Sequence, residues 1–498
     1  MQLLPLLAFG QVASAFYDDG VKLFAQKDYN GALERFTKAI AADPNSFEAY
    51  NFRGIIKSEL ADYAGAMVEF DKAIAINPKA YSAYANRGHV KILMNDFKGA
   101  VADCDLSLAI DSGYEIAYAA RGGAKDGLGD FAGALKDFNK AINISPTDFN
   151  AFNGRGNVEN ALKDYTDAIA DFNKAIEINP QYAEAYANRG ASKKSINDND
   201  GAIADYNKAI LINPKVAAIY MNRGVTKGML GDNTGAMTDY DQAIAIDPKS
   251  AHAYENRGAL KFRLNDVSGA TADVKEALAL NPQFAEAYYD RGEIKNVTND
   301  PQGAIADLTT AISLKPDFAN AYHDRGCIKQ RLQDFNGAIA DLSQAIAINP
   351  DFDMAYANRG ITKMASQDLY GAVDDYAKAI ALAPEKPTPY YYRGFINMNM
   401  GYPALALPDF DRVIKLLPNA ADSYCCRGEC KNMTHDYNGA LADLNQAIQL
   451  NSKFAQAYSY RAQAKYFLND KTGACADWQK AIDFGDARAA GDMNKFCK

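Results

Sequence analysis

The 498-residue sequence lacks the long hydrophobic segments, basic blocks and grouped metal ligands that mark several functional classes. No run of about 18 apolar residues occurs, so no transmembrane helix is predicted. The net charge is −9 and lysine and arginine are spread evenly, which argues against a nucleic-acid partner. The four histidines (His89, His252, His323 and His435) lie far apart without ligand spacing, and the glycines form no phosphate-binding loop. We therefore predict a protein without a catalytic centre, metal or cofactor.

Cysteine is also scarce, because seven residues do not make a disulfide scaffold in a chain of this length. Cys425, Cys426 and Cys430 lie within one predicted helix and lack the second cluster that a zinc site needs. Cys475 and Cys497 would meet if the C-terminal tail folds back as a helix, and a disulfide would then fasten that end. The alternative for each cysteine is a small, buried apolar side chain. Both interpretations stay open for Cys475 and Cys497.

The dominant feature of the sequence is a 34-residue repeat that occurs fourteen times, from Ala13 to Arg488, without insertion or deletion. The sixth copy, from Ala183 to Val216, gives the numbering of repeat positions 1 to 34. A fixed period of this length indicates a solenoid, in which each repeat packs on its neighbours. The period predicts one array over residues 13–488, between an apolar segment at 1–12 and a tail at 489–498.

Two amphipathic helices are predicted in every repeat, helix A over positions 1–14 and helix B over positions 17–30. Aspartate, a strong N-cap, occupies position 16 in thirteen copies, and proline at position 32 follows most B helices. Position 8 is glycine in the first thirteen copies, and position 20 is alanine in all fourteen. Because glycine inside a helix costs about 1 kcal/mol relative to alanine, its recurrence predicts that helix B approaches helix A closely.

An opposite-charge pair is kept in every copy. Position 7 is arginine and position 23 is acidic in thirteen copies, whereas the first copy has Asp19 and Arg35 at these places. This reversal predicts that the two positions touch across the interface between helices A and B. Lysine at position 11 is expected close by.

These features resemble the tetratricopeptide repeat family. The resemblance rests on the period, an aromatic residue at position 4, Gly at 8, Ala at 20, an aromatic or apolar residue at 24, Ala at 27 and Pro at 32, and it covers residues 13–488. The chain departs from the family pattern at positions 7 and 11, where Arg and Lys predict a more polar helix interface. The resemblance implies an all-α, right-handed superhelical solenoid whose A helices line a concave groove. Family members mostly bind peptides or proteins there and are rarely enzymes.

The inner face is expected at positions 2, 5, 6, 9, 12 and 13 of helix A. Position 6 carries a ladder of amides and carboxylates that could hydrogen-bond the backbone of an extended peptide, as in long superhelical members of the family. The alternative is that a polar residue is merely tolerated at this position. The ladder residues are Asn86, Asn188, Asn222, Asn256, Asp290, Asp324 and Asn358.

The twelfth repeat departs most from the pattern. Pro408 falls inside its helix B and is predicted to kink or break that helix. Tyr390, Tyr391, Tyr392 and Phe395 concentrate aromatic surface there. This group is either an aromatic contact site for a partner or a locally packed cluster.

The two ends leave a second function open. Residues 1–12 include the apolar stretch from Leu3 to Phe9, which lacks the positive charge of a typical signal peptide but precedes a small-residue cleavage pattern. The chain is thus either secreted or periplasmic, or cytoplasmic. If the segment is retained, it could contact the C-terminal end of another copy and build a head-to-tail filament. The leading hypothesis is a non-enzymatic scaffold that binds protein or peptide segments, and the alternative is this self-assembling subunit.

Overall fold

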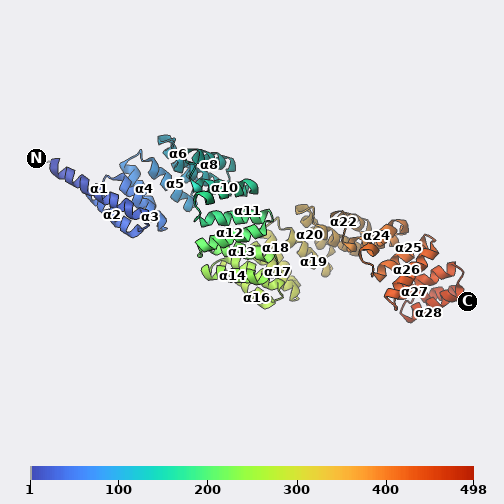
Figure 1. Cartoon of the computed structure of the whole chain (residues 1–498). Coiled ribbons are helices and arrows are strands. Elements are labelled where there is room, and N and C mark those ends of the chain that lie inside the picture. The colour runs from blue at the N-terminus through green and yellow to red at the C-terminus, as the bar shows by residue number, and fades with distance from the viewer. Residues whose placement is uncertain (1–2, 498) are drawn as a thin grey trace. The chain divides into compact units, whose positions relative to one another are not determined.

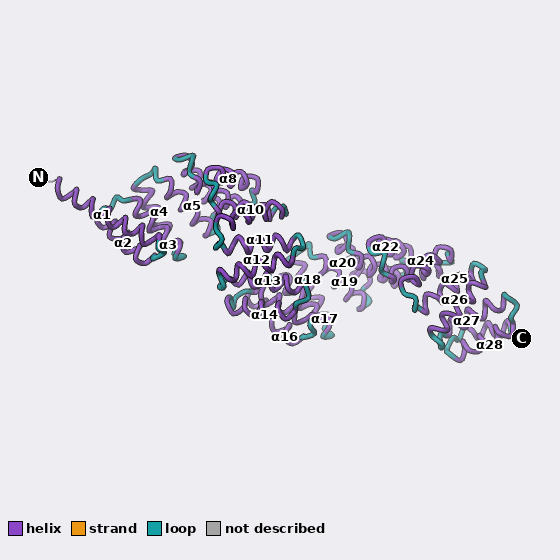
Figure 2. The backbone as a smooth tube through the Cα atoms, viewed as in Figure 1, coloured by secondary structure: helices purple, strands orange, loops and turns teal. Residues whose placement is uncertain are grey.

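Within residues 3–497, which the computed structural model describes, every regular element is a helix (Figures 1 and 2). The odd-numbered helices up to α27 are the A helices and the even-numbered helices are the B helices of successive repeats. The A helices are α1 (Leu3–Ala25), α3 (Phe47–Glu59), α5 (Tyr81–Leu93), α7 (Glu115–Gly127), α9 (Phe149–Ala161), α11 (Ala183–Ser195), α13 (Ala217–Met229), α15 (Ala251–Arg263), α17 (Ala285–Val297), α19 (Ala319–Arg331), α21 (Asp353–Ala365), α23 (Pro387–Asn399), α25 (Ala421–Met433) and α27 (Ala455–Phe467). The B helices are α2 (Tyr29–Ala42), α4 (Tyr63–Ile76), α6 (Phe97–Ile110), α8 (Phe131–Ile144), α10 (Tyr165–Ile178), α12 (Asn199–Ile212), α14 (Asn233–Ile246), α16 (Val267–Leu280), α18 (Pro301–Leu314), α20 (Phe335–Ile348), α22 (Leu369–Leu382), α24 (Pro403–Leu416), α26 (Tyr437–Leu450) and α28 (Lys471–Asp483).

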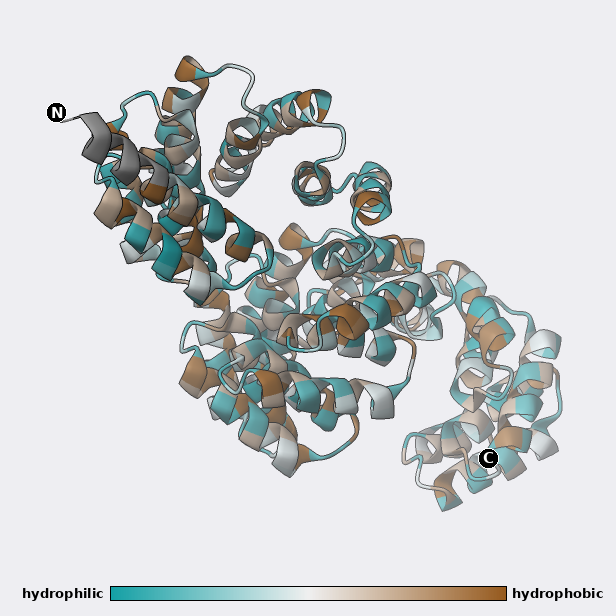
Figure 3. Cartoon of the chain, turned by 60° about the vertical axis from the view of Figure 1, so that its left-hand side comes forward, coloured by the Kyte–Doolittle hydropathy of each residue, from teal (hydrophilic) through white to brown (hydrophobic). Residues whose placement is uncertain are grey.

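The chain divides into two compact units, Met1–Asn256 and Arg257–Lys498, with the boundary inside α15. Within each unit, A helices pack against their own B helix and against the B helix of the preceding repeat, and several of them also contact the A helix of a neighbouring repeat. Hydrophobic and hydrophilic residues alternate along these helices, as expected where every helix has one packed and one solvated side (Figure 3). The predicted all-α solenoid of helix-turn-helix repeats is confirmed.

The turn between helices A and B is the same in all fourteen repeats. Position 15 has a positive φ each time, and it is occupied by residues such as Asn95 (62°) or Gly129 (76°). In thirteen repeats the aspartate that follows caps helix B, as where the Asp96 carboxylate accepts a hydrogen bond from the Gly99 backbone N–H at 2.9 Å, whereas repeat 12 has Tyr402 there without a side-chain cap. A left-handed residue followed by a strong N-cap ends one helix and starts the next within three residues.

Close packing of helices A and B depends on the glycine at position 8. A Cβ atom added to Gly54 would lie 2.6 Å from Cε1 of Phe70, the position-24 ring of the same repeat. The facing alanine, Ala66 at position 20, is fully buried. The close approach predicted from these two positions is confirmed, and it explains why a helix-weakening glycine is repeated.

The twelfth repeat corrects one prediction. Helix α24 runs without interruption from Pro403 to Leu416, so the predicted break at Pro408 is wrong. Proline removes the hydrogen bond that residue 408 would donate to the carbonyl of Ala404. Both Pro408 and Ala404 are exposed, so water can satisfy that carbonyl and the helix continues.

The C-terminal tail forms α29 (Ala489–Phe496), which packs against the last helix pair. The Phe496 ring stacks on Trp478 with centroids 5.6 Å apart, and Cys475 and Cys497 form a disulfide. The tail therefore covers apolar surface of the last repeat, and the disulfide holds it in place.

At the other end, α1 begins at Leu3 and continues without a break into helix A of the first repeat. Residues 1–2 and the side chains before Val12 lie outside the described part of the chain, so the hypothesis of an apolar end contact stays a prediction. None of the described helices is long and apolar enough to cross a membrane.

Candidate functional site

A network of charged side chains fixes the framework on which any site is built. In repeat 3, Arg87 Nη2 lies 2.6 Å from Asp103 Oδ1, and Lys91 Nζ lies 2.7 Å from the other oxygen of that carboxylate. Arg87 Nη1 also reaches Asp71 of the preceding repeat at 2.7 Å. The arginine at position 7 therefore joins the B helices of two successive repeats.

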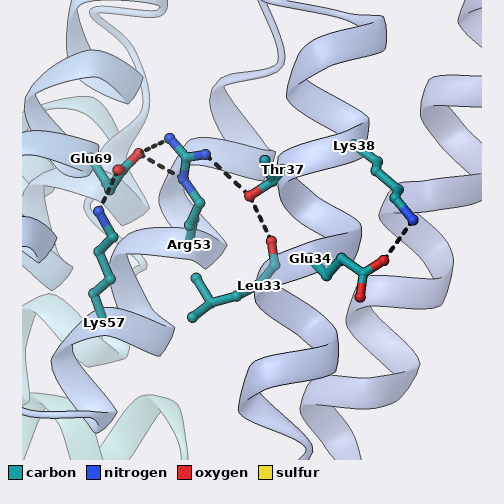
Figure 4. A pocket seen from close by; sticks show the side chains of 7 residues that line it. All are labelled: Leu33, Glu34, Thr37, Lys38, Arg53, Lys57 and Glu69. Carbon is teal, nitrogen blue, oxygen red and sulfur yellow. Dashed lines mark hydrogen bonds and ion pairs between the residues drawn. The ribbon is translucent and has the colours of Figure 1, made fainter.

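The same arrangement recurs along the chain. Figure 4 shows Arg53 between Glu69 and Thr37, with Lys57 on the second oxygen of Glu69 at 2.7 Å. The pair between positions 7 and 23 forms in all thirteen repeats that have arginine at position 7, which confirms the predicted contact and the nearby lysine. The thirteen acidic partners are Glu69, Asp103, Asp137, Asp171, Asp205, Asp239, Asp273, Asp307, Asp341, Asp375, Asp409, Asp443 and Asp477.

The first repeat does not follow the prediction. Asp19 pairs with Lys22 at 3.8 Å, and the guanidinium of Arg35 lies over the Phe16 ring at 6.0 Å, so the reversed charges do not meet among the described residues. In this repeat the short aspartate is on helix A and the long arginine is on helix B. The other thirteen repeats have the long side chain on helix A, so the two arrangements do not bring the charges to the same place. The inference drawn from this copy was wrong, although the contact it predicted is present elsewhere.

Repeat 5 carries Glu159 at position 11, where eleven repeats have lysine. Its carboxylate lies 3.9 Å from Arg155 and close to Asp171. Desolvation, together with the negative charge of Asp171, raises the pKa of Glu159 to about 7, although Arg155 opposes the shift.

In repeat 4 the usual triad of Arg121, Lys125 and Asp137 shifts the pKa of its carboxyl group in the opposite direction. Burial would raise the pKa of Asp137, but hydrogen bonds from Arg121 and Lys125 lower it overall.

The position-6 ladder is partly engaged within the protein. Asn86 Nδ2 donates to Asn51 Oδ1 at 3.0 Å, and Asn188 Nδ2 donates to Asn153 Oδ1 at 3.1 Å. Position 6 of one repeat is thus bonded to position 5 of the preceding repeat, and the ladder braces neighbouring A helices. Asn256 instead donates to its own helix, at the His252 carbonyl. All seven predicted ladder residues, including Asn222, Asp290, Asp324 and Asn358, are half-buried.

In unit 2 the inner positions hold a hydrogen-bonded cluster that the sequence analysis missed. His323 Nδ1 lies 2.8 Å from Asp324 Oδ1, and its Nε2 lies 2.8 Å from Asn358 Nδ2 and 3.7 Å from Cys327 Sγ. Tyr289 donates to the other oxygen of Asp324 at 2.7 Å. Desolvation lowers the pKa of His323, but Asp324 and Cys327 outweigh it and raise that pKa to about 9. The sequence signal was the H-D-x-x-C pattern on one helix, which places His323 and Cys327 one turn apart on the same face with Asp324 next to the histidine.

The ladder is interrupted in unit 1, and a hollow lies at the interruption. Position 6 is Ala120 in repeat 4 and Gly154 in repeat 5, and position 9 of repeat 4 is Gly123. All three line a hollow of about 840 Å³ bordered by residues of α3, α5, α7, α9 and α11. Most of its lining comes from the positions assigned to the inner face, among them Asn86. The side chains left out by alanine and glycine account for its depth.

The hollow is acidic. Glu59, Glu115, Asp148 and Glu184 line it, and no lysine or arginine does. Glu184 is held in place because Asn153 Nδ2 donates to one oxygen at 3.1 Å and Tyr182 Oη to the other at 3.2 Å.

His89, which also lines the hollow, adds little positive charge to it. Desolvation lowers the pKa of His89 and only Glu59 opposes the shift, so this imidazole is neutral at pH 7. The hollow therefore presents carboxylates and amides to an occupant without a compensating cation.

The aromatic group of repeat 12 packs within the protein. Tyr392 stacks on Tyr376 at 5.8 Å, and Tyr391 contacts Phe395 and Phe410 at 6.1 and 6.2 Å. Arg393 lies over the Tyr390 ring at 6.0 Å. These contacts favour the locally packed alternative, and the aromatic contact site stays a prediction.

The remaining titratable groups do not assemble into a metal site. Cys425 and Cys430 are buried free thiols. Across residues 3–497, no group of three or more His, Cys, Asp or Glu side chains is placed to hold a metal ion. The hollow of unit 1, with its amides and carboxylates, is therefore taken as the candidate site.

Fold and site define a helical-repeat solenoid with an acidic hollow lined mainly by A helices of unit 1. The chain belongs to the tetratricopeptide repeat family. Three models of this family, described as TPR repeat or tetratricopeptide repeat, match more than half of the sequence between them. The matched residues are 156–194 and 229–265, then 116–148, 183–216 and 319–352, and finally 17–89 and 256–319.

Among solved structures, the chain is similar to one described as an APC/C hetero-tetramer of Cut9 and Hcn1, with 13% identity, coverage of 98% of this chain and 96% of that one, and a TM-score of 0.52. This likeness concerns the fold alone. YrrB, described as a TPR protein with an unusual peptide-binding site, is 21% identical over 38% of this chain and 97% of its own, with a TM-score of 0.36. A tetratricopeptide repeat protein from Parabacteroides merdae is 19% identical over 51% and 97%, with a TM-score of 0.40. No curated protein sequence matches the chain.

Proposed function

We propose that this protein is a non-enzymatic scaffold that binds an extended segment of another protein or peptide on the A helices of unit 1. The observation that carries the proposal is the hollow of about 840 Å³ at the interruption of the ladder. It is deep enough for several side chains of a ligand, and pockets of this size are typical of binding sites. Most of its lining comes from inner-face positions, which take no part in the ion pairs between helices A and B.

Amides around the hollow support an extended occupant. Asn86 lines it from α5, and Asn150, Asn153 and Asn157 line it from α9. A primary amide has two N–H donors and an acceptor oxygen. The bond from Asn86 to Asn51 uses one donor and leaves the second for a peptide carbonyl. Such amides would hold a backbone without reading its side chains.

The test is to fill the hollow without disturbing the framework. A Cβ atom added at Gly123 would meet only Ile92 Cδ1, at 3.8 Å, an ordinary contact, so the variant Gly123→Leu directs a side chain toward the hollow from a position with room for its first atom. Random twelve-residue peptides displayed on phage would be selected on the full chain, and the strongest would be synthesised with a fluorescent label. We expect its affinity, measured by fluorescence anisotropy, to fall about tenfold or more in Gly123→Leu, because the lost contacts exceed about 1.4 kcal/mol.

The matched control is Ala259→Leu, which places the same side chain at position 9 of repeat 8, away from the lining of the hollow. This variant should bind the peptide as the parent does. Full affinity in Gly123→Leu, or equal losses in both variants, would show that the groove is not the binding surface.

A further inference from the structure

The hollow differs from the other inner surfaces in its floor. Repeat 4 is the only copy with alanine or glycine at positions 5, 6 and 9 together, as Ala119, Ala120 and Gly123. Repeat 5 adds Gly154, where a Cβ atom would lie 2.6 Å from the ring of Phe138. An apolar floor of small side chains and one aromatic ring is therefore open to a long side chain from outside.

The rim differs from the floor in being charged. Glu59 comes from α3, Glu115 from α7 and Glu184 from α11, so carboxylates surround the hollow from three A helices. Asp148 contributes as the N-cap of α9, where it accepts hydrogen bonds from the Asn150 and Ala151 backbone N–H groups. A low-dielectric recess surrounded by charges of one sign concentrates the potential and attracts the opposite charge.

From this floor and rim we propose that the occupant is a protein segment that inserts one arginine or lysine side chain into the hollow. The proposal rests on the proposed function and names its partner's chemistry. The apolar stem of the side chain packs on Ala120, Gly123 and Phe138, and its cationic end reaches the carboxylates of Glu115 and Glu184. Long basic side chains bury their methylene groups in this way while keeping the charge at a polar rim. An acidic segment or a free C-terminal carboxylate would be repelled.

The experiment uses the full chain and the strongest peptide from the phage selection. Each basic residue of that peptide is replaced in turn by a neutral analogue, citrulline for arginine or norleucine for lysine. We expect one position at which neutralisation lowers the affinity about tenfold. The double variant Glu115→Gln with Glu184→Gln should weaken the parent peptide by about tenfold as well, since it removes both carboxylates that the cationic end reaches. The same double variant should change the neutral peptide less than twofold.

The control is Glu276→Gln, which removes an exposed carboxylate of α16 that does not line the hollow. This variant should bind the parent peptide unchanged, and helical content measured by circular dichroism should be the same in all variants. A peptide could lose affinity for Gly123→Leu and yet carry no basic residue, or bind equally well when its basic residues are neutralised. This result would overturn the cationic partner but would still support peptide binding at the hollow. Peptides that bind Gly123→Leu as well as the parent would overturn both.

Discussion

The inner positions of repeat 4 and repeat 10 show opposite uses of one framework. In repeat 4, positions 5, 6 and 9 are Ala119, Ala120 and Gly123, which border a hollow. In repeat 10 the same positions are His323, Asp324 and Cys327, which form a hydrogen-bonded cluster with neighbouring repeats. Both repeats keep the glycine at position 8 and the ion pairs of position 23. The residues that pack helix A against helix B are therefore the same in both repeats. The residues at positions 5, 6 and 9 differ, and they either leave a cavity or form hydrogen bonds to neighbouring repeats.

The largest expected effect comes from removing the framework beneath the hollow. In Asp137→Ala, Arg121 and Lys125 lose their shared partner, and the largely buried Arg121 keeps only its ion pair to the exposed carboxylate of Asp105 at 2.6 Å. Breaking a buried pair in this way costs about 3–5 kcal/mol. Urea unfolding followed by circular dichroism should show this loss, whereas Gly123→Leu on the inner face of the same repeat should retain parental stability. Similar stability of the two variants would contradict the separation of framework from inner face.

The acid dependence of this effect has a definite sign. The pKa of Asp137 is lowered on folding, so its contribution is present above the ordinary pKa of an aspartate and is lost as the pH falls through the folded value. The stability difference between the parent and Asp137→Ala should therefore shrink in acid. A stability difference that stays constant while the pH falls from neutral through the pKa of Asp137 would contradict the ion pairs of Asp137 with Arg121 and Lys125.

A smaller effect is expected from the brace in repeat 10. The pKa of His323 is raised to about 9 on folding, so its contribution to stability is complete below the ordinary value of about 6.5 and is lost as the pH rises through 9. We expect His323→Gln to be less stable than the parent by about 2 kcal/mol at pH 6, and by much less at pH 10. The groups facing His323 are Asp324, Cys327 and Asn358, and Cys327→Ser serves as a control that keeps the imidazole. A pH-independent difference would show that this histidine only fills space.

The smallest effect is expected at the triad of repeat 5, where Glu159 replaces the lysine. Folding raises the pKa of Glu159 to about 7, which means that the folded state disfavours the ionised carboxylate. The parent should therefore lose stability as the pH rises from about 4.5 to 7. Glu159→Lys restores the usual pairing with Asp171 and should stabilise the chain by about 1–2 kcal/mol at pH 8. Thermal unfolding at pH 5 and pH 8 measures the gain, which should be larger at pH 8. A larger gain at pH 5 would contradict the assigned pKa direction.

Much of the fold was predictable because it depends on residues close in sequence. Asp96, Gly54 and Ala66 each specify a cap or a contact within one repeat, and fourteen copies of such signals fix the helix bounds to within a residue. The contact between positions 7 and 23 was also predictable, because both lie in the same repeat. The predicted break at Pro408 does not occur because exposure, not sequence position, decides whether a freed carbonyl can bind water, while the kink stays a prediction.

The candidate site was predictable only in outline. The inner-face positions were assigned from the family resemblance, and the hollow uses them. Its location was not predicted, since the sequence analysis considered the residues present on the inner face and did not consider the small residues Ala120, Gly123 and Gly154. The hydrogen bonds that tie Asn86 to Asn51 and Asn188 to Asn153 were also missed, because they join different repeats.

The sequence by itself determined the repeat, the two helices in each copy, their caps, the close contact at Gly54 and the charge pairing of helix A with helix B. These features depend on local backbone preferences and on spacings within 34 residues. Only the tertiary structure decided that Asp19 and Arg35 do not meet, that the ladder braces neighbouring helices, and that repeats 4 and 5 leave an acidic hollow. The physical reason is that these outcomes depend on how side chains from separate helices fill or leave the space between them, which no single helix pattern specifies.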